Sequence, residues 1–161
     1  MLNTLYKFME PHRGMGNARD NLDSACRRYE NCVQCAKLEF GDSCHADRAY
    51  KFETSEEFGE NVFTCTDSLD GGSDEGCRKK LCDCDKKLAE DLSVEQENFE
   101  IQHSTQFGGD FNKYTCYLST RTKLAPADSC CGEGTVRTPF DSGRAECCDG
   151  GFVKGLGFGG C

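Results

Sequence analysis

The sequence predicts a mainly α-helical, disulfide-rich domain followed by an irregular tail that is rich in cysteine and glycine. The chain of 161 residues contains 14 cysteines and 18 glycines but no tryptophan, a composition typical of a disulfide scaffold rather than of a large apolar core. Two long segments carry apolar residues and cysteines at helical spacing, and a short hairpin pattern lies between them. We therefore expect two long helices that are cross-linked by disulfides.

The first helical segment is short, because the apolar residues from Leu2 to Met9 have helical spacing and Pro11 ends the run. A longer helix is predicted over Asn21–Phe40, and Gly41 is a natural stop for it. One face of this helix carries Leu22, Cys26, Tyr29 and Val33.

A β-hairpin is predicted over Lys51–Cys65, where two aromatic-bearing arms flank an acidic turn. The second long helix is predicted near Cys77–Leu92. One face of that helix carries Cys77, Leu81, Cys84, Leu88 and Leu92. Beyond it the pattern weakens, so we divide the chain into a helical domain over residues 1–95 and a cysteine- and glycine-rich tail over residues 96–161.

The net charge limits the class of binding partner, and the cysteines indicate the compartment in which the protein folds. The net charge of −9 argues against a nucleic-acid partner, because binding nucleic acid depends on neutralising phosphates. Calcium, mineral surfaces and basic proteins fit the charge better. Disulfides need an oxidising compartment, so we expect a secreted, extracellular protein. No apolar run approaches the roughly 18 residues of a membrane-spanning helix.

The segment from Phe52 to Cys77 contains eight acidic residues and no basic residue. Two interpretations stay open: a solvated face that keeps the protein soluble, or weak contact with calcium or mineral at several points. The spacing does not match an EF-hand loop, so calcium affinity should be of the weak, extracellular kind. The candidate calcium ligands are Asp67, Asp70, Asp74 and Glu75. No other cofactor is expected.

Three motifs over residues 2–92 resemble the secretory phospholipase A₂ family. LNTLYKF resembles the opening helix of that family, LDSACRRYENC its first catalytic helix, and GCRKKLCDCDKKLAEDL its second. The resemblance implies a phospholipase A₂-like pair of cross-linked long helices with a short β-hairpin. In that family a histidine activates water, an aspartate orients the histidine, and calcium polarises the ester.

The same resemblance implies that the catalytic site is vestigial. It places Tyr29 at the histidine position, Glu30 at the calcium-binding aspartate position, and Asp85 at the second-helix aspartate position. A phenol with a pKa of about 10 is a poor base at neutral pH. The glycine-rich calcium loop of the family has no counterpart before the first long helix. We therefore expect no enzyme activity. Tyr29 should be packed in the core, and Asp85 should accept a hydrogen bond from its hydroxyl group.

The resemblance also implies disulfide pairs. They are Cys32–Cys84, Cys44–Cys77 and Cys65–Cys82. A further bridge of the family would join the positions of Ala25 and Asp91, and both of its cysteines are missing together here.

Cys26 and Cys35 have no partner by resemblance. They stand nine residues apart, which is about 13 Å along a helix, whereas a disulfide needs Cα atoms within roughly 7 Å. If the helix is continuous, each must reach Cys116, a tail cysteine or another chain.

The tail contains two vicinal pairs, Cys130-Cys131 and Cys147-Cys148, and ends at Cys161. The stretch CCGEGTVRTPFDSGRAECCDGG resembles the dicysteine repeats of galaxins, which are coral-skeleton matrix proteins. Neighbouring cysteines on a strand point to opposite faces, so each pair can link in two directions.

Two other uses of the cysteines are less consistent with the sequence. The spacings Cys32/Cys35 and Cys82/Cys84 are compatible with zinc binding, but cysteines occur throughout and the three histidines are scattered, which favours oxidised pairs. Cys44-His45 as a catalytic pair is disfavoured on the same grounds.

These observations predict a non-enzymatic extracellular structural or matrix protein, associated with biomineral, that binds calcium weakly through acidic loops. The otoconins of inner-ear calcite reuse the phospholipase A₂ fold without its catalysis. The expected partners are other matrix proteins or a mineral surface, in a homo- or hetero-oligomer. The alternatives are a secreted calcium-dependent phospholipase A₂ and a lipid-binding or toxin-like module.

Overall fold

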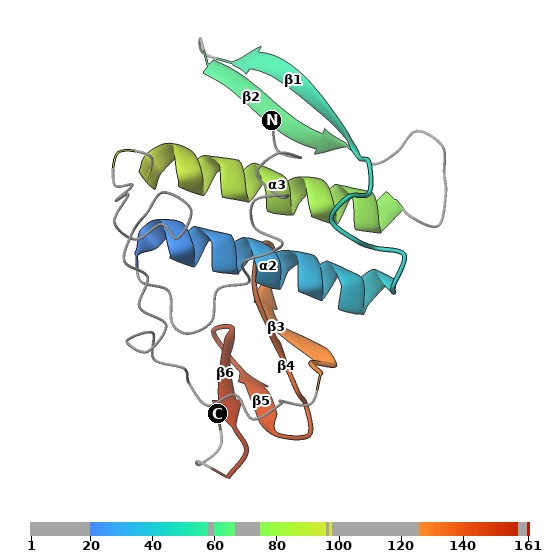
Figure 1. The fold of residues 1–161 in the computed structure, drawn as a ribbon, viewed down its shortest axis with the longest axis vertical. Helices are drawn as coiled ribbons and strands as arrows, with labels where there is room; N and C mark the ends of the chain where they lie inside the picture. The colour runs from blue at the N-terminus through green and yellow to red at the C-terminus, as the bar shows by residue number, and fades with distance from the viewer. Residues whose placement is uncertain (1–19, 58–59, 67–74, 96, 98–125, 158–160) are drawn as a thin grey trace, which may run out of the picture.

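The computed structural model describes residues 20–57, 60–66, 75–95, 97, 126–157 and 161 (Figure 1). Its helices are α2 (Asn21–Phe40) and α3 (Glu75–Glu95), and its strands are β1 (Lys51–Glu57), β2 (Glu60–Thr66), β3 (Ser129–Glu133), β4 (Val136–Phe140), β5 (Ala145–Cys148) and β6 (Phe152–Gly155). The helices lie side by side, with β1 and β2 beyond α3 and the other strands beyond α2 (Figure 1). The short helix predicted near Leu2 lies outside the described residues.

Local sequence signals set both ends of α2. The Asp20 side chain caps its N-terminus by accepting a hydrogen bond from the Asp23 backbone N–H at 2.7 Å. At the other end, Gly41 has a φ of 88° and its N–H donates to the Lys37 carbonyl at 2.9 Å. The predicted bounds of this helix are confirmed. The second helix, α3, extends a few residues beyond the predicted range at each end.

The two helices run antiparallel and pack through small apolar clusters rich in cysteine. One cluster contains Ala25, Tyr29, Cys32, Cys84 and Leu88. The second contains Ala36, Cys44, Cys77 and Leu81. The bonds Cys32–Cys84 and Cys44–Cys77 lie within these clusters. Disulfides therefore hold the helix pair together where a larger protein would rely on more aliphatic burial.

A two-stranded hairpin lies on the side of α3 that faces away from α2 (Figure 1). The Cys65–Cys82 disulfide joins β2 to α3, and the Lys86 amine donates to the Phe63 carbonyl at 2.7 Å. The hairpin predicted for this segment is confirmed. All three disulfides that the phospholipase A₂ resemblance implied are present in the structure.

The tail is more regular than the sequence analysis predicted. Two antiparallel hairpins, β3–β4 and β5–β6, replace the expected irregular strip. Gly132 is needed in the first of them, because its φ is +103° and a Cβ atom there would lie 2.4 Å from the Val136 carbonyl oxygen. These strands are only four or five residues long, and the Cys131–Cys147 disulfide between β3 and β5 compensates for their shortness.

The vicinal cysteines link in two directions, as predicted from strand alternation. Cys130 bonds to Cys35 of α2, whereas its neighbour Cys131 bonds to Cys147 of β5. Cys148 in turn bonds to Cys161.

In its described residues the chain is thus disulfide-rich, with two helices and short antiparallel strands. The predicted "mainly α" class is not clearly confirmed, because the described residues also form six strands. The predicted boundary near residue 95 coincides with the end of α3, but the tail strand β4 contacts α2 directly. In the ranges that the structure describes, no helix combines the length and hydropathy needed to cross a membrane.

Candidate functional site

Three polar side chains meet between the helices and the start of the β1–β2 hairpin. Tyr50 donates its hydroxyl hydrogen to Oδ2 of Asp85 at 2.5 Å. Tyr29 of α2 is buried and also hydrogen-bonds to Asp85 of α3. Asp85 therefore accepts hydrogen bonds from two phenols. The sequence analysis predicted the hydrogen bond from Tyr29. Tyr50 was not predicted as a partner.

Burial sets the charge preferences of this cluster. It raises the pKa of Asp85, although the hydrogen bonds from Tyr50 and Tyr29 lower it in part. Burial also raises the pKa of Tyr50, and the neighbouring Asp85 raises it further. The phenol of Tyr50 consequently stays protonated at neutral pH and acts as a donor. It has no capacity to activate water as a general base.

Tyr29 and Glu30, which the resemblance places at the histidine and calcium-binding positions, point to different sides of α2. Tyr29 is buried against Leu88 in the core cluster, whereas Glu30 lies on the exposed side of α2. Consecutive helical residues point about 100° apart, so both cannot face α3. The packed-aromatic interpretation of Tyr29 agrees with this burial.

Of the four candidate calcium ligands, only Glu75 belongs to an element that the structure describes. Asp67, Asp70 and Asp74 lie outside the described residues, and Glu75 is the first residue of α3. Across the parts of the chain that the structure places, no group of three or more histidine, cysteine or acidic side chains converges as a metal site. The calcium prediction stays a prediction.

The cysteines that raised the zinc interpretation are all oxidised. Cys32 and Cys84 bond to each other, Cys82 bonds to Cys65, and Cys35 bonds to Cys130. Their sulfurs are therefore not available as thiolate ligands. Cys26 is the one cysteine in the described ranges that has no disulfide. Burial and the nearby acids Asp23 and Glu30 raise the pKa of its thiol to about 11.

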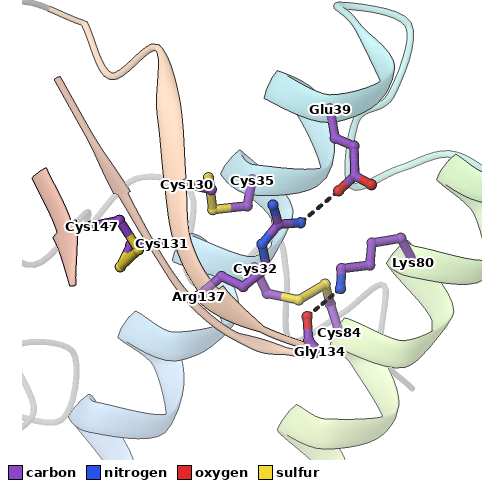
Figure 2. The surroundings of a disulfide bond; sticks show 10 residues. All are labelled: Cys32, Cys35, Glu39, Lys80, Cys84, Cys130, Cys131, Gly134, Arg137 and Cys147. Carbon is purple, nitrogen blue, oxygen red and sulfur yellow. Dashed lines mark hydrogen bonds and ion pairs between the residues drawn. A yellow bond between two sulfur atoms is a disulfide. The ribbon is translucent and has the colours of Figure 1, made fainter. Parts of the chain in front are cut away.

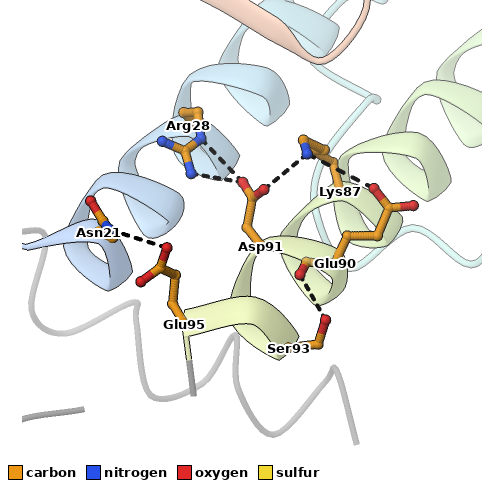
Figure 3. A network of polar contacts seen from close by, with 7 residues as sticks. All are labelled: Asn21, Arg28, Lys87, Glu90, Asp91, Ser93 and Glu95. Atoms are coloured by element: carbon orange, nitrogen blue, oxygen red, sulfur yellow. Dashed lines mark hydrogen bonds and ion pairs between the residues drawn. The ribbon is translucent and has the colours of Figure 1, made fainter. Parts of the chain in front are cut away.

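A polar network joins the helices at the end where α2 begins and α3 ends (Figure 3). Arg28 donates from Nη2 to Oδ2 of Asp91 at 2.8 Å and from Nε at 3.1 Å. Lys87 lies 2.9 Å from the other carboxylate oxygen. Nearby, the Asn21 amide donates to Glu95 at 3.1 Å. This network occupies the place where the resemblance puts the missing bridge between positions 25 and 91.

Among the described residues, a disulfide and the polar contacts of Arg137 and Lys80 attach the tail to the helices (Figure 2). Besides the Cys35–Cys130 bond, Arg137 of β4 donates to a carboxylate oxygen of Glu39 at 2.5 Å. Lys80 of α3 donates to the Gly134 carbonyl in the β3–β4 turn. The tail hairpin thus contacts both helices. The sequence offered no signal for these pairs, since charged helix residues normally indicate a solvated face.

Comparisons with known protein families, curated proteins and solved structures match nothing to this chain.

Proposed function

We propose that this chain is a non-enzymatic, extracellular structural protein with a phospholipase A₂-like helical part that has lost catalysis. The observation that supports it best is the Tyr29–Asp85–Tyr50 cluster. A hydrolase of this kind needs a base beside a carboxylate. At the position of the base this chain has the buried phenol of Tyr29, and the Asp85 carboxylate accepts hydrogen bonds from two tyrosine hydroxyl groups. The cluster holds elements together and offers no nucleophile to a substrate.

The disulfide network supports an extracellular setting. Among the described residues, six disulfides link α2, α3, the β1–β2 hairpin and both hairpins of the tail. Bonds of this number form and persist under oxidising conditions. Each also limits the unfolded chain and so raises the free energy of unfolding. Such a scaffold suits a protein that must last in a matrix.

The acidic segment suggests what the scaffold contacts. Glu53, Glu56 and Glu57 are all exposed on β1, and the whole chain carries a net charge of −9. Carboxylates are the ligands that calcium ions prefer, and dispersed carboxylates bind them weakly. We propose that the protein contacts a calcium mineral or the basic proteins around it. Weak calcium binding belongs to this proposal.

The enzymatic alternative is tested by fatty-acid release from phospholipid vesicles, with and without calcium. The wild-type chain and the Tyr29→His variant are both expected to release none, because the histidine would return without a calcium-binding loop. Asp85→Asn is the diagnostic variant. Calcium-dependent release by the wild type that disappears in Asp85→Asn would establish a phospholipase and overturn the proposal.

The mineral contact is tested by adsorption to calcite and apatite crystals. Glu53→Gln/Glu57→Gln should adsorb several-fold less than the wild type. The matched control is Glu133→Gln/Asp149→Asn, which makes the same charge change at exposed tail positions. Equal loss in both variants would reduce the contact to net charge alone, and no adsorption by the wild type would remove the mineral role.

The fold resemblance is tested with the double variant Ala25→Cys/Asp91→Cys. If the helices are placed as in the phospholipase A₂ family, these two cysteines should form the family's missing bridge. Peptide mapping without reduction would detect it. Free thiols at both positions in a folded variant would argue against the resemblance. Ala25→Cys alone is the control for misplaced pairing.

A further inference from the structure

We infer that the open edge of β1 binds an extended, basic segment of a partner protein, which adds to the hairpin as a third strand. The inference rests on the proposed structural role, because a protein of that kind acts by holding partners. It goes beyond that role by naming the chemistry of the partner and the place where it binds.

The first observation is the edge itself. In the described part of the chain, β2 is the single strand paired with β1, and all seven residues of β1 are exposed. In an antiparallel pair, the residues of each strand alternate between those that bond to the partner and those whose N–H and C=O groups point outward. The outer edge of β1 therefore offers a row of backbone donors and acceptors to another strand.

The second observation is that the edge is held in place. The Cys65–Cys82 disulfide and the Lys86–Phe63 hydrogen bond fix β2 on α3, and β1 pairs with β2 along its whole length. A template that is already ordered loses little conformational entropy when a segment pairs with it. Strand addition to such an edge is a common way of binding peptides.

The third observation is an exposed aromatic anchor. Phe52 of β1 is 51% exposed, and its ring stacks on Phe63 with 4.3 Å between the ring centroids. The stack fixes the ring while leaving half of the side chain accessible. Aromatic residues, Phe among them, are enriched at the cores of protein–protein interfaces.

The fourth observation is the charge along β1. Glu53 and Glu57 lie on one face of the hairpin, whereas Glu56 shares the other face with Phe52, as the register shows. A paired segment is therefore expected to carry basic residues opposite the three glutamates. The same charges disfavour a second copy of β1 as the occupant, since like charges on paired strands destabilise the pairing.

The register specifies a sequence pattern for the partner. Side chains that lie directly opposite each other interact most strongly, so an apolar residue should lie opposite Phe52 and Lys or Arg opposite each glutamate. Antiparallel pairing is the more stable arrangement per residue. In that direction the partner reads Lys-Lys-x-x-Lys-Leu from its N-terminus.

The test uses the full oxidised chain and a fluorescent peptide, Gly-Lys-Lys-Thr-Thr-Lys-Leu-Gly, in a polarisation titration. Glu53→Lys/Glu57→Lys should weaken binding by about tenfold or more, because two attractive contacts become repulsive. Glu133→Lys/Asp149→Lys makes the same charge change in the tail and should alter binding by less than about twofold. Equal weakening in both variants would reduce the effect to net charge and overturn the edge site.

Backbone pairing is tested by methylating one peptide nitrogen at a time. Binding should fall at every second position, because only alternate N–H groups of the added strand face β1. Uniform tolerance of methylation, or no binding at all, would overturn the inference. So would concentration-dependent dimers in sedimentation that Glu53→Lys/Glu57→Lys changes, since a second copy would then occupy the edge.

These outcomes are separable from the fate of the proposed function. Fatty-acid release would refute the non-enzymatic role while leaving peptide binding at β1 unchanged. A chain that releases no fatty acid and also fails to bind the peptide refutes the edge site alone.

Discussion

Arg28 of α2 and Asp91 of α3 form a two-point contact in which both Nε and Nη2 of the guanidinium donate to the same carboxylate oxygen. Lys87 approaches the other oxygen of that carboxylate. The side chain of Asp91 is only 14% exposed, so this contact is partly shielded from water. It joins the helices at the end opposite to the Cys44–Cys77 bond.

Replacing Arg28 should destabilise the fold modestly and in a pH-dependent way. Burial raises the pKa of Asp91, but hydrogen bonds from Lys87 and Arg28 outweigh it and hold the pKa below its usual value. A lowered carboxyl pKa contributes stability above the usual pKa of about 4, and that stability is lost as the pH falls through the lower folded value. Because the Arg28 side chain is 40% exposed, solvent screening limits the effect.

We expect Arg28→Gln to lower the free energy of unfolding at pH 7 by about 0.5–1 kcal/mol, and by much less at pH 2. Urea unfolding at both pH values measures this. Arg144→Gln is the control, since Arg144 is 60% exposed and lies 3.4 Å from Asp141. An equal loss at both pH values would mean that Arg28 stabilises the helices by packing alone.

Asp85→Asn should change the pH dependence of stability in the opposite sense. Burial raises the pKa of Asp85, so the folded state holds a proton more tightly than the unfolded state does. Stability from this group is greatest below the usual pKa and declines as the pH rises through the folded value. An asparagine still accepts a hydrogen bond from the Tyr50 hydroxyl and does not ionise.

Thermal or urea unfolding between pH 3 and pH 8 should therefore show a flatter profile for Asp85→Asn than for the wild type. Asp85→Leu leaves the Tyr50 and Tyr29 hydroxyl groups without their acceptor and should cost about 1–3 kcal/mol at pH 3. Indistinguishable profiles for the wild type and Asp85→Asn would contradict the raised pKa.

The Cys35–Cys130 bond should decide whether the tail hairpin stays on α2. These cysteines are 95 residues apart, so the bond closes a long loop, and its removal should cost about 3–4 kcal/mol of tail stability. In Cys35→Ala/Cys130→Ala, the amide hydrogens of β3 and β4 should exchange much faster, whereas those of α2 and α3 keep most of their protection.

Hydrogen exchange read by mass spectrometry measures this separation. Cys148→Ala/Cys161→Ala is the matched control, because those cysteines are only 13 residues apart and lie away from the helices. If the helix amides lose protection together with the tail, the tail and the helices form one cooperative unit.

The Cys26 thiol should react slowly with alkylating reagents. Burial and its acidic neighbours raise its pKa to about 11, so little thiolate is present at pH 8, and the thiolate is the reacting species. We expect labelling by iodoacetamide to be at least about tenfold slower than in the unfolded chain. The measurement uses Cys116→Ser, so that residue 116, which lies outside the described ranges, does not take up label.

In the unaltered chain, mapping without reduction shows whether Cys26 is bonded at all. Fast labelling of Cys26 in the folded Cys116→Ser variant would contradict the raised pKa. A Cys26–Cys35 bond would contradict both the continuous α2 helix and the Cys35–Cys130 pair.

Features that local sequence determines were predictable. The bounds of α2 follow from Asp20 and Gly41, which end the helix through contacts within four residues. The helix-facing cysteines were predictable from their spacing. The pairs Cys32–Cys84, Cys44–Cys77 and Cys65–Cys82 were predictable only from the family resemblance. Helix ends and cysteine spacing can be read within the helical segments, without reference to the tail.

Features that depend on distant contacts were not predictable. The tail strands are short, and their stability comes from disulfides and from contact with α2. Arg28 and Asp91 lie 63 residues apart, and such charged residues on helices normally indicate solvent. Tyr50 precedes β1 without any periodic signal, so its bond to Asp85 was visible only once the chain was folded.

The order of the disulfides has a mechanical consequence. Cys161 bonds to Cys148. Cys147, which precedes Cys148 in the chain, bonds to Cys131, and Cys130, which precedes Cys131, bonds to Cys35. One helical turn away from Cys35, the Cys32–Cys84 bond continues into α3. Tension applied at Cys161 would thus pass through sulfur bonds and very short stretches of backbone into the helix pair. The tail would therefore extend very little under load, unless the disulfides were reduced.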